Sequence, residues 1–360
     1  MNHSFFANPR FANSCFESVQ SFVLWLIAAI HVAALASLLL VIGMLSTAHA
    51  QEVACHGINL VEELKAENPD AYARVVAEGD KVPNGKGIFW KIEKPGLPSS
   101  YLLGTMHVSD PRVLKMPAGA SEALDAVRTV VIESDEVLDD KKAMAGMLAK
   151  PELTMFTDET SIDKLLDPDD LAVLEEGLKK RGVPLSAVSR MKPWMLMSLV
   201  SLPACEMARK GQTAFLDKGI AQDAAAKGKT VKGLETLAEQ LSAMASIPMD
   251  VHLKSLVETI RIGAKMDDVF ETMTELYLSG NIGLTVPFLK QVAPDGTDDA
   301  GYAEFEQLIV TKRNHLMAER AAPILAEGAA FIAVGALHLP GEEGLVELLR
   351  RQGFTVTAVN

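Results

Sequence analysis

The sequence is poor in cysteine and in aromatic residues, and it contains no cluster of basic side chains. Three cysteines in 360 residues exclude a disulfide-rich scaffold, and a chain of this length can bury a core without such cross-links. Acidic residues outnumber basic ones by 47 to 34, which gives a formal net charge of −13. A protein with this balance has no positive field to attract phosphate backbones, so we expect no nucleic-acid partner.

Several sequence signatures of hydrolases are also absent. The chain has no His-Glu-x-x-His helix, no Gly-x-Ser-x-Gly elbow, no Cys-x-x-Cys pair and no Walker loop. A serine or cysteine nucleophile is therefore less favoured, although a catalytic triad is defined by geometry and needs no short motif. A metal-independent esterase that uses histidine and carboxylate alone stays an open alternative.

The N-terminal segment has the pattern of an export signal. Residues 22–45 are almost continuously apolar, and Ala48 and Ala50 then form a small-x-small cleavage pattern. We predict a signal peptide over residues 1–50, with an uncleaved membrane anchor as the alternative, because the apolar run reaches the roughly 20 residues that span a bilayer. Residues 51–360 are then exported, either periplasmic or anchored facing the periplasm, and contact the membrane only through an uncleaved anchor.

The three cysteines agree with this location. Cys15 lies in the predicted signal segment, which leaves Cys55 and Cys205 as an even pair in an oxidising compartment. We expect a disulfide between them. Spacing alone leaves two unrelated buried thiols as an alternative.

Short segments rich in β-branched and aromatic residues occur near both ends of the exported part. The predicted strands are residues 88–92, 101–103, 129–132, 331–334 and 354–359. Residues from about 139 to 289 instead show the start and stop signals of helices, with acidic residues where a helix begins and basic residues where it ends. The fold class predicted is α/β (α+β-like): one domain, residues 51–360, whose central sheet comes from N- and C-terminal segments and carries a large helical insertion.

Two histidines follow predicted strands in the same Gly-x-x-His pattern. Gly104 precedes His107 and Gly335 precedes His338, and Glu133 directly follows a third strand. A glycine lets the backbone turn and presents the imidazole beyond the carboxyl end of the strand, where α/β sheets bind ligands. Two imidazoles and one carboxylate form a ligand set for a divalent metal ion. The alternative is that each histidine only hydrogen-bonds to a turn.

A divalent ion at these residues suits hydrolysis at neutral pH. Such an ion lowers the pKa of a bound water from about 15.7 towards about 7 and polarises a carbonyl group. His56, His252 and His315 do not follow a predicted strand, and we expect them to be structural or exposed.

Several separated motifs, in this order, resemble the TraB/GumN family, whose animal relatives include the Tiki proteases that trim Wnt ligands. The resemblance covers most of the exported part and implies a metal-dependent peptidase, with manganese or cobalt favoured in the Tiki branch. Leu337 stands where a smaller residue is frequent in the family. The motifs are SYLLGTMH (100–107), VIE (131–133), MKPW (191–194), GLET (233–236), RN (313–314) and VGALHLPG (334–341).

The resemblance places His107, His338 and Glu133 in the family's paired motifs and acid position. It also implies roles for Arg313 and Asn314, in a helix expected over residues 302–325, and for Glu235. Arg313 can clamp a substrate carboxylate or stabilise an oxyanion, or it can lie on an exposed helix face. Asn314 can orient water or a ligand. Glu235 can be another ligand or base, or a buried carboxylate that caps a loop.

We therefore predict an exported metal-dependent hydrolase, and we favour a peptidase with a peptide or protein substrate. His107, His338 and Glu133 hold the ion, which we expect to be Mn²⁺, Co²⁺ or Zn²⁺, and Arg313 steadies the developing negative charge. The alternative is a non-catalytic protein that binds peptides or assists envelope polysaccharide production, because a fold can keep its pocket after losing catalysis. The sequence does not predict an oligomeric state.

Overall fold

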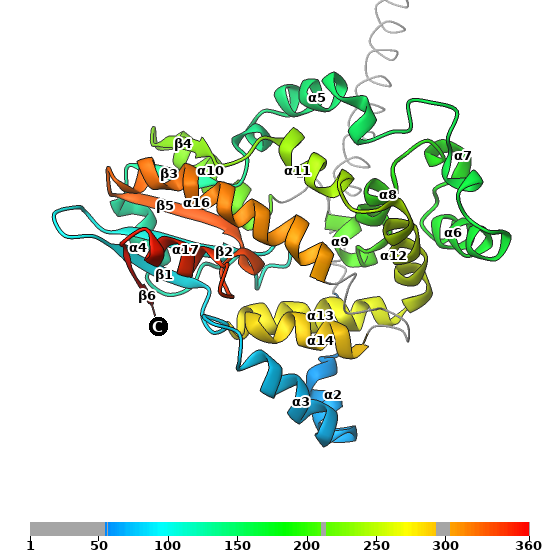
Figure 1. The fold of residues 1–360 in the computed structure, drawn as a ribbon, viewed down its shortest axis with the longest axis horizontal. Helices are drawn as coiled ribbons and strands as arrows, with labels where there is room; N and C mark the ends of the chain where they lie inside the picture. Colours follow the sequence, from blue (N-terminus) through cyan, green and yellow to red (C-terminus); the bar gives the residue numbers. More distant parts are fainter. Residues whose placement is uncertain (1–54, 56, 210–213, 293–302, 360) are drawn as a thin grey trace, which may run out of the picture. The chain divides into compact units, whose positions relative to one another are not determined.

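The computed structural model describes residues 55, 57–209, 214–292 and 303–359. Its centre is a six-stranded sheet of strand order β4-β3-β5-β2-β1-β6 (Figure 1). The strands are β1 Phe89–Glu93, β2 Ser100–Thr105, β3 Thr129–Ile132, β4 Thr230–Gly233, β5 Ala330–Gly335 and β6 Thr355–Ala358.

The sheet is mixed, with a parallel half and an antiparallel half. Strands β4, β3, β5 and β2 run parallel to one another, whereas β1 is antiparallel to both β2 and β6. Strands β1 and β2 form an antiparallel hairpin, with Phe89 opposite Leu103. The predicted α/β class, with a sheet assembled from both ends of the domain, is confirmed.

Strand β4 lies inside the segment that we expected to be helical, so that prediction was incomplete. Its four residues, Thr230–Gly233, form an edge strand whose side chains are exposed or only half buried. A short edge strand of this kind carries no hydrophobic alternation from which it could be predicted. Pairing with β3, from Thr129↔Thr230 to Ile132↔Gly233, makes it a strand.

Helices account for most of the remaining described residues. The α-helices are α2 Leu60–Glu67, α3 Pro69–Gly79, α4 Ala120–Ala126, α5 Asp140–Ala149, α6 Pro168–Lys180, α7 Leu185–Val188, α8 Pro193–Val200, α9 Ala204–Arg209, α10 Leu216–Ala226, α11 Leu237–Ala245, α12 Met249–Ile262, α13 Lys265–Leu278, α14 Thr285–Val292, α16 Lys312–Leu325 and α17 Leu345–Arg351. Short helical turns are η1 Asp135–Leu138, η2 Pro151–Leu153, η3 Ile162–Lys164, η4 Ile282–Leu284 and η6 Ala336–His338, and η5 Glu306–Thr311 is a π-helix.

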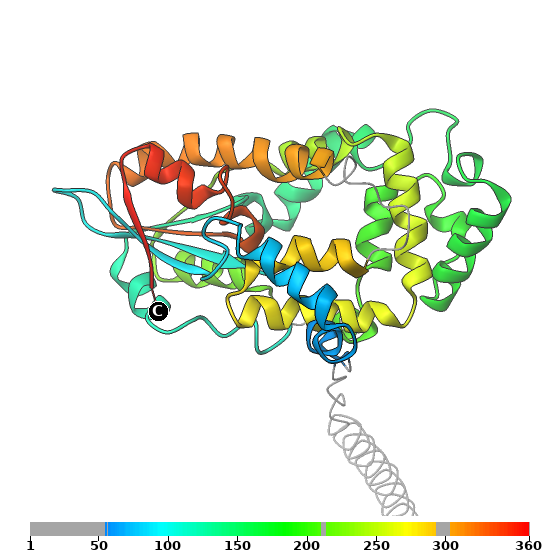
Figure 2. The same cartoon turned by 60° about the horizontal axis from the view of Figure 1, so that its bottom comes forward.

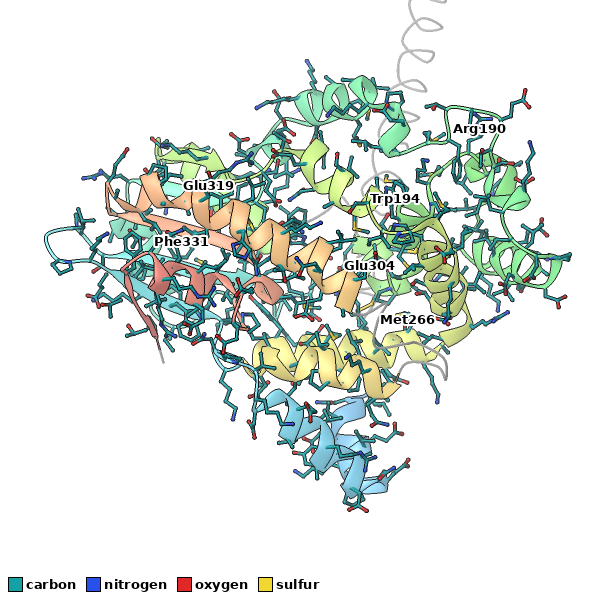
Figure 3. The ribbon with its side chains drawn as sticks, in the orientation of Figure 1. Arg190, Trp194, Met266, Glu304, Glu319 and Phe331 are labelled. Atoms are coloured by element: carbon teal, nitrogen blue, oxygen red, sulfur yellow. A yellow bond between two sulfur atoms is a disulfide. The ribbon has the colours of Figure 1, made fainter. Side chains whose placement is uncertain are left out.

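Helices cover both faces of the sheet, which makes three layers. One face packs against α16 and α17, seen in orange and red on one side of the strands in Figure 2. Met317 and Leu349 from these helices join Leu102 and Ile332 of the sheet in one core cluster. The other face packs against α4 and α10, and Phe331 of β5, labelled in Figure 3, points to this side.

Two smaller hydrophobic clusters lie beside the sheet. Helices α6, α8 and α12 share one core, and α3, α13 and α14 contribute to another with α2. Helix α6 shows how the sequence determines where a helix begins and ends. The Asp167 side chain accepts hydrogen bonds from the Asp169 and Asp170 amides, Pro168 begins the helix, and basic residues end it. Trp194 of α8, labelled in Figure 3, packs against the ring of His252 on α12, with the ring centroids 4.8 Å apart.

The expected disulfide is present, and it ties the start of the described chain to α9. Cys55 and Cys205 are bonded, with Cα atoms 5.3 Å apart. Among the helices of the described residues, none is long and apolar enough to cross a membrane. The predicted signal peptide or anchor, residues 1–50, lies outside the described residues.

Candidate active site

Four neighbouring parallel strands end in ionisable side chains at one edge of the sheet. In the spatial order β4, β3, β5, β2, the residues just beyond the strands are Glu235, Glu133, His338 and His107. Because these strands are parallel, their carboxyl ends lie at the same edge of the sheet. The side chains predicted from separate motifs are therefore brought to one site.

The two motif glycines are needed for space. Neither Gly104 nor Gly335 has a positive φ, so the sharp glycine-dependent turn that we expected is not their role. A Cβ atom on Gly104 would lie 3.0 Å from Cα of Ala336, and one on Gly335 would lie 3.1 Å from Oε1 of Glu133. Gly335 thus lets the Glu133 carboxylate reach the backbone at the end of β5.

Glu133 is buried and well supplied with donors. Its Oε1 accepts a hydrogen bond from the Gly335 amide at 2.7 Å, and its Oε2 accepts from Arg313 Nη2 at 2.7 Å and from Gln240 Nε2 at 3.0 Å. Burial by itself raises the pKa of Glu133, but the charges of His338, His107 and Arg313 outweigh it and lower that pKa to about 2. Glu133 is therefore a carboxylate at neutral pH.

His338 is held by Asn314 from the opposite side. Its Nδ1 lies 2.7 Å from Asn314 Oδ1, while Asn314 Nδ2 donates to the carbonyl of Glu343 at 2.8 Å. That second bond orients the amide so that Oδ1 accepts, which assigns the proton of the neutral imidazole to Nδ1. Nε2 then carries a lone pair and lies 3.8 Å from Oε1 of Glu133. Burial lowers the pKa of His338 to about 4, so the ring is neutral at pH 7.

His107 lines the same edge but is more open than His338. Half of its side chain is exposed, and its Nε2 lies 3.2 Å from Oδ2 of the buried Asp217. The Phe215 ring packs 5.0 Å from the imidazole, centre to centre. Burial lowers the pKa of His107, but hydrogen bonding and charge from Asp217 outweigh it, and the net direction is upward.

Arg313 connects the two glutamates instead of lying on an exposed helix face. Its side chain is 14% exposed, and Nη2 is 2.7 Å from both Glu133 Oε2 and Glu235 Oε2. Nε adds a bond of 3.0 Å to Glu235 Oε1. Gln240 Nε2 contacts the same two carboxylates, at 3.0 and 3.4 Å. Glu235 is therefore paired with a cation inside the protein.

Arg313 and Asn314 are adjacent in α16 and serve different partners. The π-helix Glu306–Thr311 runs directly into α16 just before this pair. Wide helical turns of this type are frequent at functional sites. From here Arg313 extends to the glutamates, and Asn314 extends to His338 on the neighbouring strand end.

Four residues of the site line a pocket of about 310 Å³. We call these charged and imidazole groups, His107, Glu133, Arg313 and His338, the charged wall. Most of the other lining residues, which we call the apolar wall, come from α13, from η4 and from the two Gly-x-x-His segments. They are Met106, Met273, Tyr277, Ile282, Thr285, Ala336 and Leu337. A pocket with a few convergent polar groups and an apolar lining is typical of a ligand site.

The donors suit a divalent ion in type, and two of them suit it in spacing. Ligands of one ion, each about 2.1 Å from it, lie about 3–4 Å apart, and His338 Nε2 and Glu133 Oε1 are 3.8 Å apart. Asn314 gives His338 the outer-sphere support that metal-bound histidines require. In the part of the chain described here, however, no three His, Cys, Asp or Glu side chains converge closely enough for a preassembled site.

Unpaired buried atoms also cluster at this edge. Among described residues, four buried side-chain atoms lack a hydrogen-bond partner, and three of them belong to Thr105, Ser134 and Asp217. Thr105 ends β2, Ser134 follows Glu133, and Asp217 contacts His107. Buried polar groups are normally paired, so an unpaired set around a pocket favours a ligand, water or ion at that place.

Sequence reasoning missed two residues of the site, Gln240 and Asp217, and it predicted the surroundings of His252 and His315 correctly. Gln240 stands on α11 and Asp217 on α10, and neither belongs to a motif with a recognisable chemical pattern. Their roles depend on contacts with Glu133 and His107 across more than 100 residues of chain. His252 is buried with Nε2 2.8 Å from the Met244 carbonyl, and His315 is an exposed partner of Glu343. His56 lies outside the described residues.

Sequence comparison finds relatives that are named metalloproteases. Metalloprotease TIKI2 of Danio rerio is 24% identical over 316 residues, which cover 74% of this chain and 60% of that protein. Metalloprotease TIKI1 of Danio rerio is 23% identical over 313 residues, which cover 74% and 62%. The alignment with TIKI2 of Xenopus tropicalis covers 57% of that relative. The chain thus spans about three fifths of the length of these relatives. No solved structure gives a match.

The family model described as the TraB/PrgY/gumN family matches residues 88–358. This span contains the whole sheet and every residue of the site described above. The resemblance inferred from separate motifs therefore agrees with a match over most of the chain. The protein belongs to the TraB/PrgY/gumN family.

Proposed function

We propose that this protein is a metal-dependent hydrolase that cleaves peptide bonds in a peptide or protein substrate. The observation that carries the proposal is the convergence of His107, Glu133 and His338 at the carboxyl ends of three adjacent parallel strands. The relatives named metalloproteases support the class of reaction.

His338 through Nε2 and Glu133 through Oε1 are the first two proposed ligands, and His107 is the third. A divalent ion such as Mn²⁺, Co²⁺ or Zn²⁺ supplies a Lewis acid and a water of lowered pKa when bound. The chain itself keeps His338 and Glu133 in the protonation states that metal binding requires, because His338 is neutral and Glu133 is ionised at pH 7.

Arg313 has two roles in this proposal. Its Nε and Nη2 fix Glu133 and Glu235, which keeps the Glu133 carboxylate oriented towards His338. Among the described residues, its Nη1 has only a long contact of 3.4 Å, with the Ile309 carbonyl. Because Arg313 lines the pocket, Nη1 is the donor available to a substrate oxygen that becomes negatively charged during hydrolysis.

The apolar wall supports a peptide substrate with an apolar side chain next to the reacting bond. Met273 and Ile282 line the same pocket as the charged groups, and Tyr277 is fixed by donating to the Gly104 carbonyl at 3.0 Å. An aliphatic side chain gains free energy by leaving water for such a surface. The charged wall then acts on the adjoining backbone carbonyl.

Export of residues 51–360 is part of the proposal. The apolar segment of residues 22–45 with its cleavage pattern supports it, and so does the Cys55–Cys205 disulfide, because such bonds persist in oxidising compartments. N-terminal sequencing of protein from the cell envelope tests cleavage after Ala50. A mature chain that retains residue 1 contradicts cleavage and favours the anchor.

The central test combines metal binding with peptide cleavage. Calorimetric titration with Mn²⁺, Co²⁺ and Zn²⁺ is compared between the wild type and a His107→Ala/His338→Ala double variant, and the same proteins are incubated with a peptide library. We expect binding and metal-dependent cleavage by the wild type, and loss of both in the double variant. His315→Ala is the matched control because His315 is exposed and pairs with Glu343. Unchanged metal affinity in the double variant removes this mechanism.

A second function, peptide binding without catalysis, is favoured by the internal pairing of Glu133. Both of its oxygens already accept hydrogen bonds from Gly335, Gln240 and Arg313, which satisfies the carboxylate without a metal. Peptides that bind but are not cleaved with any of the three metals support this alternative. Cleavage that survives complete chelation supports a metal-independent hydrolase instead.

A further inference from the structure

Asp217 is a buried carboxylate that the proposed chemistry does not yet use. It is the second residue of α10, and its side chain is 6% exposed. Oδ2 lies 3.2 Å from His107 Nε2, while Oδ1 is buried without a partner among the described residues. Its charge also contributes, after burial, to raising the pKa of Tyr277 on the pocket wall.

This arrangement is a poor way to stabilise a fold. A carboxylate in the first turn of α10 gains some stabilisation from the helix dipole. However, its one side-chain partner is itself half exposed, and its unpaired oxygen adds a desolvation cost. An apolar residue of similar size would avoid this cost at the start of α10. The position is therefore better explained by an effect on His107 than by stability.

We propose that Asp217 is a positioning residue that fixes the tautomer of His107, so that Nε2 carries the proton and Nδ1 offers its lone pair to the pocket. A carboxylate oxygen can only accept, so Nε2 must donate in this contact. The hydrogen bond at one imidazole nitrogen determines which nitrogen is left to bind a ligand. Packing of Phe215 against the ring restricts rotation away from Asp217.

The two imidazoles then present opposite nitrogens. His338 is held through Nδ1 by Asn314 and offers Nε2, whereas His107 is held through Nε2 by Asp217 and offers Nδ1. The inference rests on the proposed function only in what the lone pair is for. The tautomer itself can be measured without metal or substrate.

The test is nuclear magnetic resonance of the full-length protein labelled with ¹⁵N-histidine, at a pH where neutral imidazole dominates. The wild type is compared with Asp217→Asn and Asp217→Leu, and a His107→Gln variant assigns the signal. Asp110→Asn is the matched control, because Asp110 is a buried carboxylate of the same region that pairs with Arg112 and not with His107.

We expect an exchange-protected, downfield proton on Nε2 of His107 in the wild type and in Asp110→Asn. Asp217→Asn keeps this signal but moves it upfield, because an amide oxygen accepts a weaker hydrogen bond than a carboxylate. Asp217→Leu loses it. If the leucine variant does not fold, the upfield shift in Asp217→Asn decides the question.

A protected proton on Nδ1 overturns the proposal, and so does an Nε2 signal that Asp217→Asn leaves unchanged. Calorimetric titration of the same proteins with Mn²⁺, Co²⁺ and Zn²⁺ separates this result from the fate of the proposed function. A protected Nε2 proton without any metal binding supports the positioning role and contradicts the metal-dependent function. Metal binding with a proton on Nδ1 overturns the positioning role alone.

Discussion

Oδ1 of Asn314 lies 2.7 Å from Nδ1 of His338, although the two residues are 24 positions apart in the chain. The contact turns the lone pair of Nε2 towards Glu133, 3.8 Å away. Asn314 on helix α16 therefore supports the metal binding proposed for His338, which follows β5.

Asn314→Ala is expected to weaken divalent-ion binding by about 10–100-fold, because the ring loses the hydrogen bond that selects its tautomer and orientation. Titration calorimetry with Mn²⁺ or Zn²⁺ measures the change. Asn59→Ala is the control, since Asn59 only caps α2 and its loss affects stability alone. Equal affinities for the wild type and Asn314→Ala would separate Asn314 from the proposed ligand His338.

His338 is expected to make the protein less stable as the pH falls from about 6.5 to about 4. Burial lowers its folded-state pKa to about 4 from the ordinary value of 6.5, so in this range the unfolded chain binds a proton that the folded chain excludes. The free energy of unfolding then falls by up to about 3 kcal/mol across the window. Urea unfolding at pH 7 and pH 4.5 measures it, and His338→Gln removes this part of the slope. Parallel pH profiles for the two proteins would show that the ring titrates normally.

The sequence predicted the convergence of the site because a simple rule governs parallel strands. Each of His107, Glu133 and His338 follows a segment with a recognisable strand pattern, and parallel strands bring such ends to one edge. The place of Arg313 in the site was harder to predict, because the sequence of its helix does not reveal whether the side chain faces solvent or Glu133.

Residues whose role depends on a distant partner could not be predicted. Asp217 and Gln240 stand on ordinary helices, and their importance comes from contacts with His107 and Glu133. Strand β4 is likewise formed by pairing with β3 at the edge of the sheet. Tertiary contacts decide such cases, and local propensity carries no signal of them.

Arg313→Met is expected to destabilise the fold by about 3–5 kcal/mol, because it leaves the buried Glu133 and Glu235 without a cation. The cost should be smaller in a Glu235→Gln background, with a coupling of about 0.5–3 kcal/mol in a double-mutant cycle by urea unfolding.

The matched control is Arg320→Met on the same helix. Arg320 pairs with Glu239, and both side chains are 38% exposed, so its loss should cost no more than about 1 kcal/mol. Similar losses for the two arginines would mean that the Glu133–Arg313–Glu235 group contributes no more than an exposed ion pair.

Reduction of the Cys55–Cys205 disulfide is expected to lower the free energy of unfolding by about 2–5 kcal/mol. The bond joins residues 150 positions apart, and a loop of this length loses much entropy when it is closed in the unfolded chain. Denaturant unfolding with and without reductant measures the effect, and Cys55→Ser should reproduce the reduced state. Sensitivity to reductant that persists in Cys55→Ser would contradict this origin.

Met273→Glu is expected to raise KM for peptides with an aliphatic residue beside the cleaved bond by about 10–200-fold, with a smaller effect on kcat. Met273 lines the apolar wall of the pocket, and a charge there removes the gain from burying an aliphatic side chain. Met266→Glu is the control, because Met266 belongs to the same helix α13 but does not line the pocket (Figure 3). Cleavage rates with peptides that differ only at this residue provide the measurement. An equal loss for aliphatic and polar peptides would place the substrate side chain away from Met273, because only a direct contact makes the loss depend on that side chain.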